Sequence, residues 1–212
     1  MRIAPIVLAA GDSTRMGFPK ALLPIGADIF LTRILNTLEN AGLPDATVVL
    51  GSHAEEILPR ISGRRVRIVI NPNPSEGQLS SIKLALSGLD PSIAGCLLWP
   101  VDHPGISENL VGALIKQFID CRAPLVLPHC EEKRGHPAIF ARTLFQEILE
   151  TPLHEGLKKL VLRHSHEMNL LPTNELATIE DIDTPEDYFS FTGVKLEEAL
   201  EKAKNSAKCL LT

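Results

Sequence analysis

Short runs of β-favouring apolar residues alternate with amphipathic segments along the first 128 residues of this chain. Five runs have the length of strands: Ile3–Ala9, Thr47–Leu50, Val66–Ile70, Cys96–Val101 and Leu125–Pro128. Runs that are apolar throughout, as several of these are, are typical of a parallel sheet covered on both faces. The intervening residues 29–38, 79–89 and 110–118 carry large apolar side chains at helical spacing. This order predicts an α/β fold with a doubly wound, mostly parallel sheet and right-handed connections.

The regular alternation weakens in the second half of the chain. The elements predicted there are an extended segment at 130–140 and helices at 142–150, 154–164 and 195–208. The last of these has alternating charges, which is typical of a solvated helix. We expect one domain over residues 1–192, in which 1–128 form the main half and 129–192 add a small subdomain. A helical tail is expected over 193–212.

Composition limits the partners and the compartment of the protein. A net charge of −5 over 212 residues argues against a nucleic-acid partner, because a phosphate backbone requires a basic surface. No apolar stretch approaches the length that spans a bilayer, so we expect a cytoplasmic protein with no membrane partner. The cysteines are scattered and are expected to be buried free thiols, which fits a reducing compartment. They are Cys96, Cys121, Cys130 and Cys209.

The segment LAAGDSTRMGFPKALLP, residues 8–24, directly follows the first predicted strand. Ligands of open α/β sheets bind at the carboxyl ends of the strands, so this loop is expected to face a site. Gly11 and Gly17 permit unusual backbone angles and close approach of a ligand, while Arg15 and Lys20 add two positive charges. Together with backbone N–H groups at residues 10–13, they form a plausible cradle for a triphosphate.

Neither GxGxxG nor the P-loop pattern GxxxxGK[ST] is present in this loop. The alternative interpretation is a solvated turn between a strand and a helix with incidental basic residues.

The segment after the third predicted strand, residues 71–86, also has two interpretations. Gly77 frees the backbone there, and Ser80 or Ser81 is placed to cap the next helix. That helix either directs its N-terminus at a ligand or is an ordinary capped helix.

Carboxylates follow two of the predicted elements. Asp102 lies where the fourth apolar run stops, a position suited to holding Mg²⁺ through oxygen ligands, although Asp is also a common turn former. In ATIEDIDTPEDY, Thr184 is expected to be the N-cap of a helix with Pro185 at its first position. The cap leaves Asp181 and Asp183 unexplained, and strand alternation would place both on one face.

These motifs resemble the signature of the MobA-like nucleotidyltransferases, and the Leu-Ala-Ala-Gly start is similar to their molybdenum cofactor cytidylyltransferase branch. The guanylyltransferase branch more often has glycine in place of the second alanine. The resemblance implies a Rossmann-like domain with a small acceptor-side subdomain, a bound nucleoside triphosphate and Mg²⁺. Residues 1–128 would then bind the nucleotide and 129–192 the acceptor.

The resemblance also implies roles for individual residues. Arg15 and Lys20 would contact the triphosphate, and Asp102 would complete the catalytic set. The residues that would line the nucleotide are Leu8, Ala9, Ala10, Gly11, Asn71, Gly77, Ser80 and Ser81. Mg²⁺ would be held by Asp102 and by Asp183, which the family pattern favours over Asp181.

Two further segments are matched to the acceptor side. Arg134 and His136, in RGHPAIF, would hold a phosphate or a pterin, although a tight turn before a strand explains them equally well. His103 either touches the acceptor or is an incidental exposed histidine. The stretch 153–167 departs from the family pattern and keeps only Gly156 of it.

The expected reaction is transfer of CMP from CTP to the phosphate of molybdopterin, with release of pyrophosphate. Two anions must meet, so the site must cancel charge, and no covalent intermediate or general base is required. A transient contact with a molybdoenzyme is a further implication. Guanylyl transfer, or transfer to a sugar phosphate or another small phosphate, is the close alternative. A non-catalytic nucleotide-binding module or cofactor chaperone is the alternative of another class.

Overall fold

The computed structural model describes residues 1–209, and the side chains of residues 1–205. Its centre is a sheet of eight strands in the order β10-β7-β9-β6-β1-β4-β5, with β8 paired to β7. The strands are β1 (Arg2–Ala9), β4 (Ala46–Leu50), β5 (Val66–Ile70), β6 (Ile93–Pro100), β7 (Leu125–Cys130), β8 (Lys133–Arg134), β9 (Ala138–Ala141) and β10 (Met168–Pro172). A separate hairpin joins β2 (Pro24–Ile25) to β3 (Asp28–Ile29).

The sheet is mostly parallel, as the sequence predicts. Strand β1 pairs in parallel with β4 and β6, and β4 pairs in parallel with β5. The exceptions are β8, which pairs antiparallel with β7, and β9, which lies antiparallel between β6 and β7. Strand β9 is the extended segment expected near 130–140, and it places the second half of the chain in the same sheet. The strands of the half expected to bind the acceptor therefore do not fold as an independent unit.

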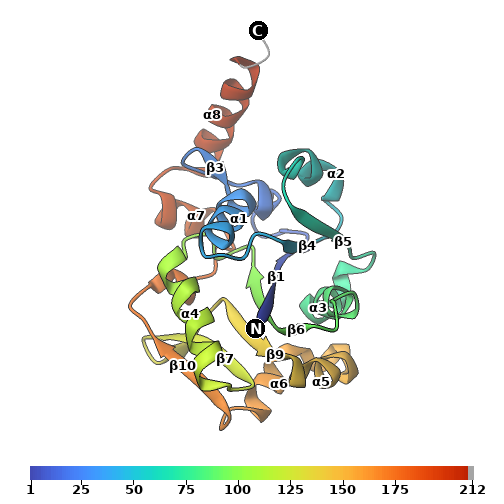
Figure 1. The fold of residues 1–212 in the computed structure, drawn as a ribbon. Helices are drawn as coiled ribbons and strands as arrows, with labels where there is room; N and C mark the ends of the chain where they lie inside the picture. Colours follow the sequence, from blue (N-terminus) through green and yellow to red (C-terminus); the bar gives the residue numbers. More distant parts are fainter. Residues whose placement is uncertain (210–212) are drawn as a thin grey trace.

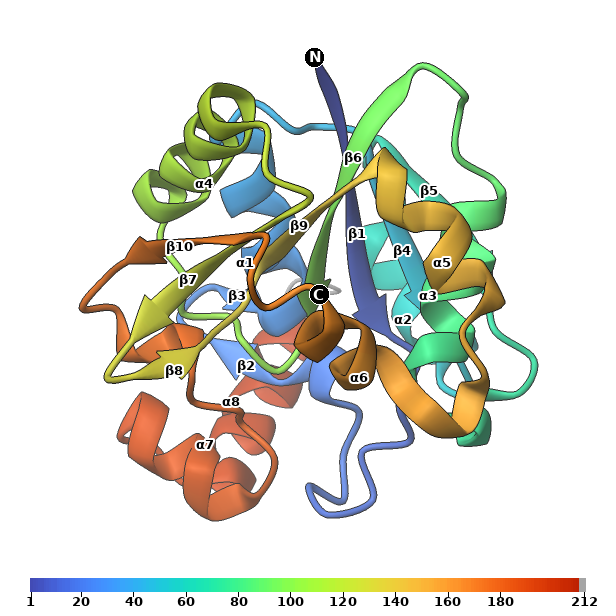
Figure 2. The ribbon, with the colours of Figure 1, turned by 90° about the horizontal axis from the view of Figure 1, so that it is seen from below.

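Helices cover both faces of the sheet (Figure 2). Helices α1 and α4 lie on one face, and α3, α5 and α6 lie on the other. The helices are α1 (Phe30–Asn40), α2 (Ala54–Ile57), α3 (Gln78–Ser87), α4 (Glu108–Cys121), α5 (Phe145–Glu150), α6 (Gly156–Arg163), α7 (Pro185–Thr192) and α8 (Leu196–Cys209). This two-sided cover explains why the strands are apolar on both faces, and it confirms the doubly wound architecture.

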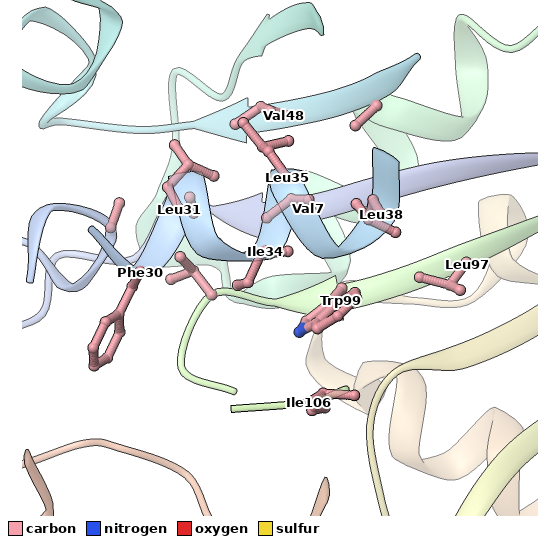
Figure 3. Close-up of a cluster of buried hydrophobic side chains, with 14 of the residues drawn as sticks. Val7, Phe30, Leu31, Ile34, Leu35, Leu38, Val48, Leu97, Trp99 and Ile106 are labelled. Atoms are coloured by element: carbon pink, nitrogen blue, oxygen red, sulfur yellow. The ribbon is translucent and has the colours of Figure 1, made fainter. Parts of the chain in front are cut away.

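Two apolar clusters, one on each face, hold these layers together. Helix α1 contributes Phe30, Ile34 and Leu38 to the cluster that also contains Trp99 of β6 (Figure 3). Their spacing of four residues places them on one helical face. Trp99 is fully buried, and its indole N–H donates to the backbone carbonyl of His103 at 2.9 Å. The turn after β6 is therefore anchored from inside the core.

Some local expectations need correction. Helix α3 begins at Gln78 with Gly77 as its N-cap, so Ser80 and Ser81 lie inside the helix and do not cap it. Cys96 and Cys130 are buried, as expected, but Cys121 is exposed. The side chain of Cys209 lies outside the described residues.

The C-terminal segment forms the expected helix. Helix α8 packs Leu196 and Ala199 against the body, and its later turns project away from it (Figure 1). Residues 210–212 of the expected tail are not described. Within residues 1–209, no helix is both long enough and apolar enough to cross a membrane.

Candidate active site

A cavity of about 310 Å³ opens where the loops after β1, β5 and β6 meet the segment before α7. Four regions far apart in the sequence therefore contribute to one site. Its lining residues are Leu8, Ala10, Gly11, Ser13, Thr14, Arg15, Lys20, Pro74, Gly77, Gln78, Ser81, Pro100, Val101, Asp102 and Asp183. Nine of the predicted site residues are among these, namely Leu8, Ala10, Gly11, Arg15, Lys20, Gly77, Ser81, Asp102 and Asp183.

The loop after β1 is closed by its own hydrogen bonds. Ser13 adopts a positive φ of 53°, and its carbonyl accepts the backbone N–H groups of Met16 and Gly17 at 3.1 and 3.0 Å. Its hydroxyl accepts the backbone N–H of Lys20 at 3.1 Å. Met16 is only 2% exposed, so it fixes the middle of the loop to the core. Because the loop is pinned at both ends, Lys20 has a defined position.

The loop is also supported from behind by residues after β4, which the sequence analysis did not single out. A Cβ atom at Gly51 would lie 2.2 Å from the carbonyl oxygen of Ala10, so only glycine permits this approach. The hydroxyl of Ser52 donates to the Asp12 carboxylate. The sequence signal for this contact is a glycine directly after the second apolar run.

Lys20 lies between two carboxylates that come from distant segments. Its Nζ is 3.2 Å from Oδ2 of Asp102 and also pairs with Oδ1 of Asp183. The Lys20 side chain is only 12% exposed, so solvent screens these pairs less than it would at the surface. Arg15 is more exposed and lies 2.5 Å from Oδ2 of Asp183. The predicted cations and carboxylates thus converge at one point.

The two carboxylates suit a divalent cation whose other ligands come from a substrate. Oδ1 of Asp102 is buried and has no hydrogen-bond partner among the described residues, which leaves a ligand position free. Asp183 lies across the Lys20 ammonium from it. The described residues hold no group of three or more metal-ligating side chains. Mg²⁺ commonly binds through one or two carboxylates together with phosphates and water, so the donor set fits that ion.

Asn71 does not line this cavity, but it holds residues of α3 next to it. It is only 3% exposed, and its side-chain N–H groups donate to the hydroxyls of Ser80 and Ser81 at 2.8 and 2.9 Å. Its side-chain oxygen accepts the backbone N–H of Asn73 at 2.9 Å. Ser81 reaches the cavity, whereas Asn71 and Ser80 do not line it. Asn71 therefore fixes the first turn of α3, whose N-terminus faces the cavity.

Several lining residues were not predicted, and Ala9 joins Asn71 and Ser80 as predicted residues that do not line the cavity. Ser13, Thr14, Pro74 and Gln78 line the cavity. Each is close in sequence to a predicted residue, so a window around the motifs would have included them. The side chain of Ala9 instead packs in the apolar cluster on the α1 face, because alternation along β1 turns it away from Ala10.

His103 is buried, so of the two alternatives left open for it, the incidental exposed histidine is wrong. Its ring is 2% exposed, with Nδ1 2.9 Å from the carbonyl oxygen of Ala177 and Nε2 2.9 Å from Oδ1 of Asp181. Burial opposes the charged ring, but the carboxylate and carbonyl partners outweigh it and raise the pKa of His103. The same hydrogen bond lowers the pKa of Asp181.

Asp181 and Asp183 consequently do not share a face. Residues 181–183 belong to no strand, so strand alternation does not apply to them. Asp183 faces Lys20, whereas Asp181 faces His103 and a second cavity of about 310 Å³. The choice of Asp183 as the carboxylate beside Asp102 agrees with this arrangement.

The predicted acceptor-side residues do not reach the first cavity. Arg134 is exposed on β8, and His136 packs its ring against His103 with centroids 4.9 Å apart. Burial and the charge of His103 lower the pKa of His136 to about 4, so its ring is neutral near pH 7. His136 therefore offers no positive charge to a phosphate at this position.

Comparison with known sequences gives one family. The profile of the MobA-like NTP transferase domain matches residues 5–168. A probable molybdenum cofactor guanylyltransferase of Pelotomaculum thermopropionicum is 32% identical, over 96% of this chain and 92% of its own length. Nicotine blue oxidoreductase of Paenarthrobacter nicotinovorans is 28% identical, over 88% of this chain and 95% of its own length.

Solved structures agree with this result. Rv0371c of Mycobacterium tuberculosis H37Rv superposes with a TM-score of 0.79 at 27% identity, over 92% of this chain and 98% of the other. A structure of that protein in complex with manganese superposes with a TM-score of 0.75, at 26% identity and over 91% and 99% of the two chains. The similarity thus extends over nearly the whole of both proteins.

Proposed function

Because the chain belongs to the MobA-like NTP transferase family, we propose that it transfers a nucleoside monophosphate from a triphosphate to the phosphate of molybdopterin. The observation that supports this most directly is the meeting of Lys20 and Arg15 with Asp102 and Asp183 in one cavity. Neutralising charge between two phosphate groups requires such a set. A purely structural ion-pair network does not need to face a cavity of this size.

In the proposed reaction, an oxygen of the acceptor phosphate forms a bond to the α-phosphorus of the triphosphate. The bond from that phosphorus to the bridging oxygen of the β-phosphate breaks, and pyrophosphate leaves with the electron pair. The phosphates compete with Asp102 and Asp183 for Lys20 and Arg15. Lys20 and Arg15 then balance the negative charge that develops on the leaving pyrophosphate.

Asp102 and Asp183 are the residues that would hold Mg²⁺. The bound ion would neutralise phosphate charge and polarise the phosphorus–oxygen bonds. The unpartnered Oδ1 of Asp102 supports this assignment. The N-terminus of α3, placed by Asn71, and the backbone around Gly11 would orient the nucleotide.

Guanylyl transfer is the better supported choice of base, because the relative from Pelotomaculum has that name. Cytidylyl transfer is the alternative, and Ala10 favours it. The Ala10 side chain lines the cavity where a glycine would leave more room, which suits the smaller pyrimidine. The name of the relative from Paenarthrobacter offers a third candidate, an oxidoreductase.

One experiment separates these candidates. The protein is incubated with GTP or CTP, Mg²⁺ and molybdopterin, and pyrophosphate and the dinucleotide product are measured. Product formation with one triphosphate supports transfer and identifies the base, while tight nucleotide binding without pyrophosphate release supports a non-catalytic module. Parallel reactions with a sugar phosphate as acceptor, and with a reduced nicotinamide cofactor, test the remaining alternatives.

A further inference from the structure

A buried imidazole lies directly behind the carboxylate of Asp102. The reaction proposed above does not use it, since His103 faces away from the first cavity and does not line it. Nε2 of His103 is 3.9 Å from Oδ1 of Asp102, which is too long for a hydrogen bond. The ring is held instead by partners on another segment of the chain.

Those partners lie on residues 177–183, the segment that carries Asp183. A carbonyl oxygen only accepts, so Nδ1 of His103 donates a hydrogen bond to Ala177 at 2.9 Å. Nε2 pairs with Oδ1 of Asp181 at 2.9 Å. The His103 side chain thus connects Ala177 and Asp181 of this segment to the turn that carries Asp102.

The turn itself is fixed from the opposite side. The indole N–H of Trp99 donates to the carbonyl of His103 at 2.9 Å, and Trp99 is fully buried. The 177–183 segment has further anchors at its ends. The backbone N–H of His136 donates to the carbonyl of Thr178 at 2.8 Å, and the capping box of Thr184 begins α7. Residues 179–183 therefore span two fixed points and depend on contacts in between.

Two contacts hold that span against the Asp102 turn. One is the backbone hydrogen bond from the N–H of Ile182 to the carbonyl of Asp102, at 3.1 Å. The other is the pair of His103 with Asp181. Both contacts involve the two residues just before Asp183, so they help to set how far its carboxylate lies from that of Asp102.

We propose that His103 is a positioning residue, which holds Asp181 and thereby fixes the separation of the Asp102 and Asp183 carboxylates. This inference rests on the proposed function, because the carboxylate pair is the proposed Mg²⁺ site. Groups that orient metal ligands commonly change metal affinity or activity by about 10- to 100-fold when they are removed. His103 does so through Asp181 and not by touching the substrate.

The test compares substitutions at two adjacent carboxylates that line the same second cavity. Asp181→Ala removes the partner of His103, and Glu180→Ala removes the same charge without touching that pair. Asp181→Asn retains an oxygen that accepts from Nε2. The readouts are Mn²⁺ affinity by electron paramagnetic resonance, kcat and KM for the triphosphate, and the melting temperature. Asp181 is exposed, so its variants are expected to fold.

We expect Asp181→Ala to weaken Mn²⁺ binding and to lower kcat by about 10-fold or more, with KM for the triphosphate changed by less than about 3-fold. Asp181→Asn should recover most of the loss, and Glu180→Ala should stay within about 2-fold of the unsubstituted protein. Equal effects of Asp181→Ala and Glu180→Ala on Mn²⁺ affinity would overturn the inference. A loss that Asp181→Asn does not recover would do the same.

The two proposals fail in different ways. If the unsubstituted protein releases no pyrophosphate with any triphosphate, the proposed function fails, and the Mn²⁺ affinities of the variants still decide the role of His103. If the protein turns over but the Asp181 variants match it in every readout, only the positioning role fails. Absence of Mn²⁺ binding by the unsubstituted protein overturns both.

Discussion

Lys20 and Asp102 are 82 residues apart in the sequence, yet Nζ of Lys20 lies 3.2 Å from Oδ2 of Asp102. The same ammonium pairs with Asp183, so one cation lies between two carboxylates and reduces their mutual repulsion. A triphosphate brings a competing set of anionic oxygens to this cation. Binding of a triphosphate is therefore expected to change the pairing of Lys20 with the two carboxylates.

Lys20→Ala is expected to weaken triphosphate binding by about 10- to 100-fold, because a charge-assisted hydrogen bond to phosphate is lost. Calorimetric titration with GTP and CTP measures the change. Lys116→Ala is the matched control, since Lys116 is exposed and pairs with Asp120 on the same helix. Unchanged affinity in Lys20→Ala would show that this lysine does not contact the phosphates.

Asp102→Asn should lower turnover by at least about 100-fold while the fold persists, because the side chain keeps its shape but loses the charge that holds Mg²⁺. Pyrophosphate release and the melting temperature are the two measurements. Asp45→Asn, at an exposed carboxylate paired with Arg65, controls for loss of one negative charge. Near-normal pyrophosphate release from Asp102→Asn would remove Asp102 from the mechanism.

Asn71→Ala should lower the free energy of unfolding by about 1–3 kcal/mol, because the hydroxyls of Ser80 and Ser81 lose a buried partner. A rise in KM for the triphosphate should accompany it, since α3 faces the cavity. Asn73→Ala is the control, as its bond to Asn71 uses a backbone N–H that the substitution retains. Denaturant titration and steady-state kinetics test the pair, and equal stability of the two variants contradicts the positioning role of Asn71.

Gly51→Ala is expected to destabilise the protein by about 1–3 kcal/mol, because the added methyl group meets the Ala10 carbonyl at 2.2 Å and must displace backbone. The loop that carries Lys20 should shift with it, so triphosphate affinity should fall as well. At Gly112, inside α4, a Cβ would meet no described atom within 4 Å. Gly112→Ala should therefore raise stability by about 1 kcal/mol. Chemical denaturation that ranks the two variants the other way refutes this account.

His164 links α6 to α5 through a 2.6 Å contact between its Nε2 and Oε2 of Glu147. That hydrogen bond is the main reason why the pKa of His164 is raised above its ordinary value of 6.5. The pair's contribution to stability is thus complete below about pH 6.5 and is lost as the pH rises through the raised pKa. The loss of unfolding free energy in His164→Gln should be larger at about pH 5.5 than at about pH 9.

His154→Gln, at an exposed histidine nearby, provides the baseline for that comparison. A His164→Gln loss that grows with pH would have the wrong sign for a charged pair with Glu147.

Local patterns predicted the elements well because their causes are local. The apolar runs form β1, β4, β5, β6 and β7. Thr184 is the expected N-cap of α7 with Pro185 at the first helical position, and Asp187 completes a capping box. Strand period, helix period and cap chemistry depend on neighbours within a few residues. The loop after β1 was predicted to face a site for the same reason, since its glycine and basic residues lie in one short segment, and it does line a cavity.

Which polar side chains are buried, and which way they point, depended on partners far away in the sequence. The sequence did not distinguish Asp181 from Asp183 by geometry, and the structure turns them to different cavities, towards His103 and Lys20. The antiparallel position of β9 between β6 and β7 could not be predicted from the sequence either, because an apolar segment of four residues fits several places in a sheet.

The sequence by itself determined the alternating α/β order, the cap before α7 and the cationic loop after β1. Only the tertiary structure decided that Lys20 pairs with both carboxylates, and that His103 is buried between the segments that carry them. The physical reason is that hydrophobic periodicity specifies which face of an element is buried. Which charged groups meet at its end depends on how the buried faces pack together.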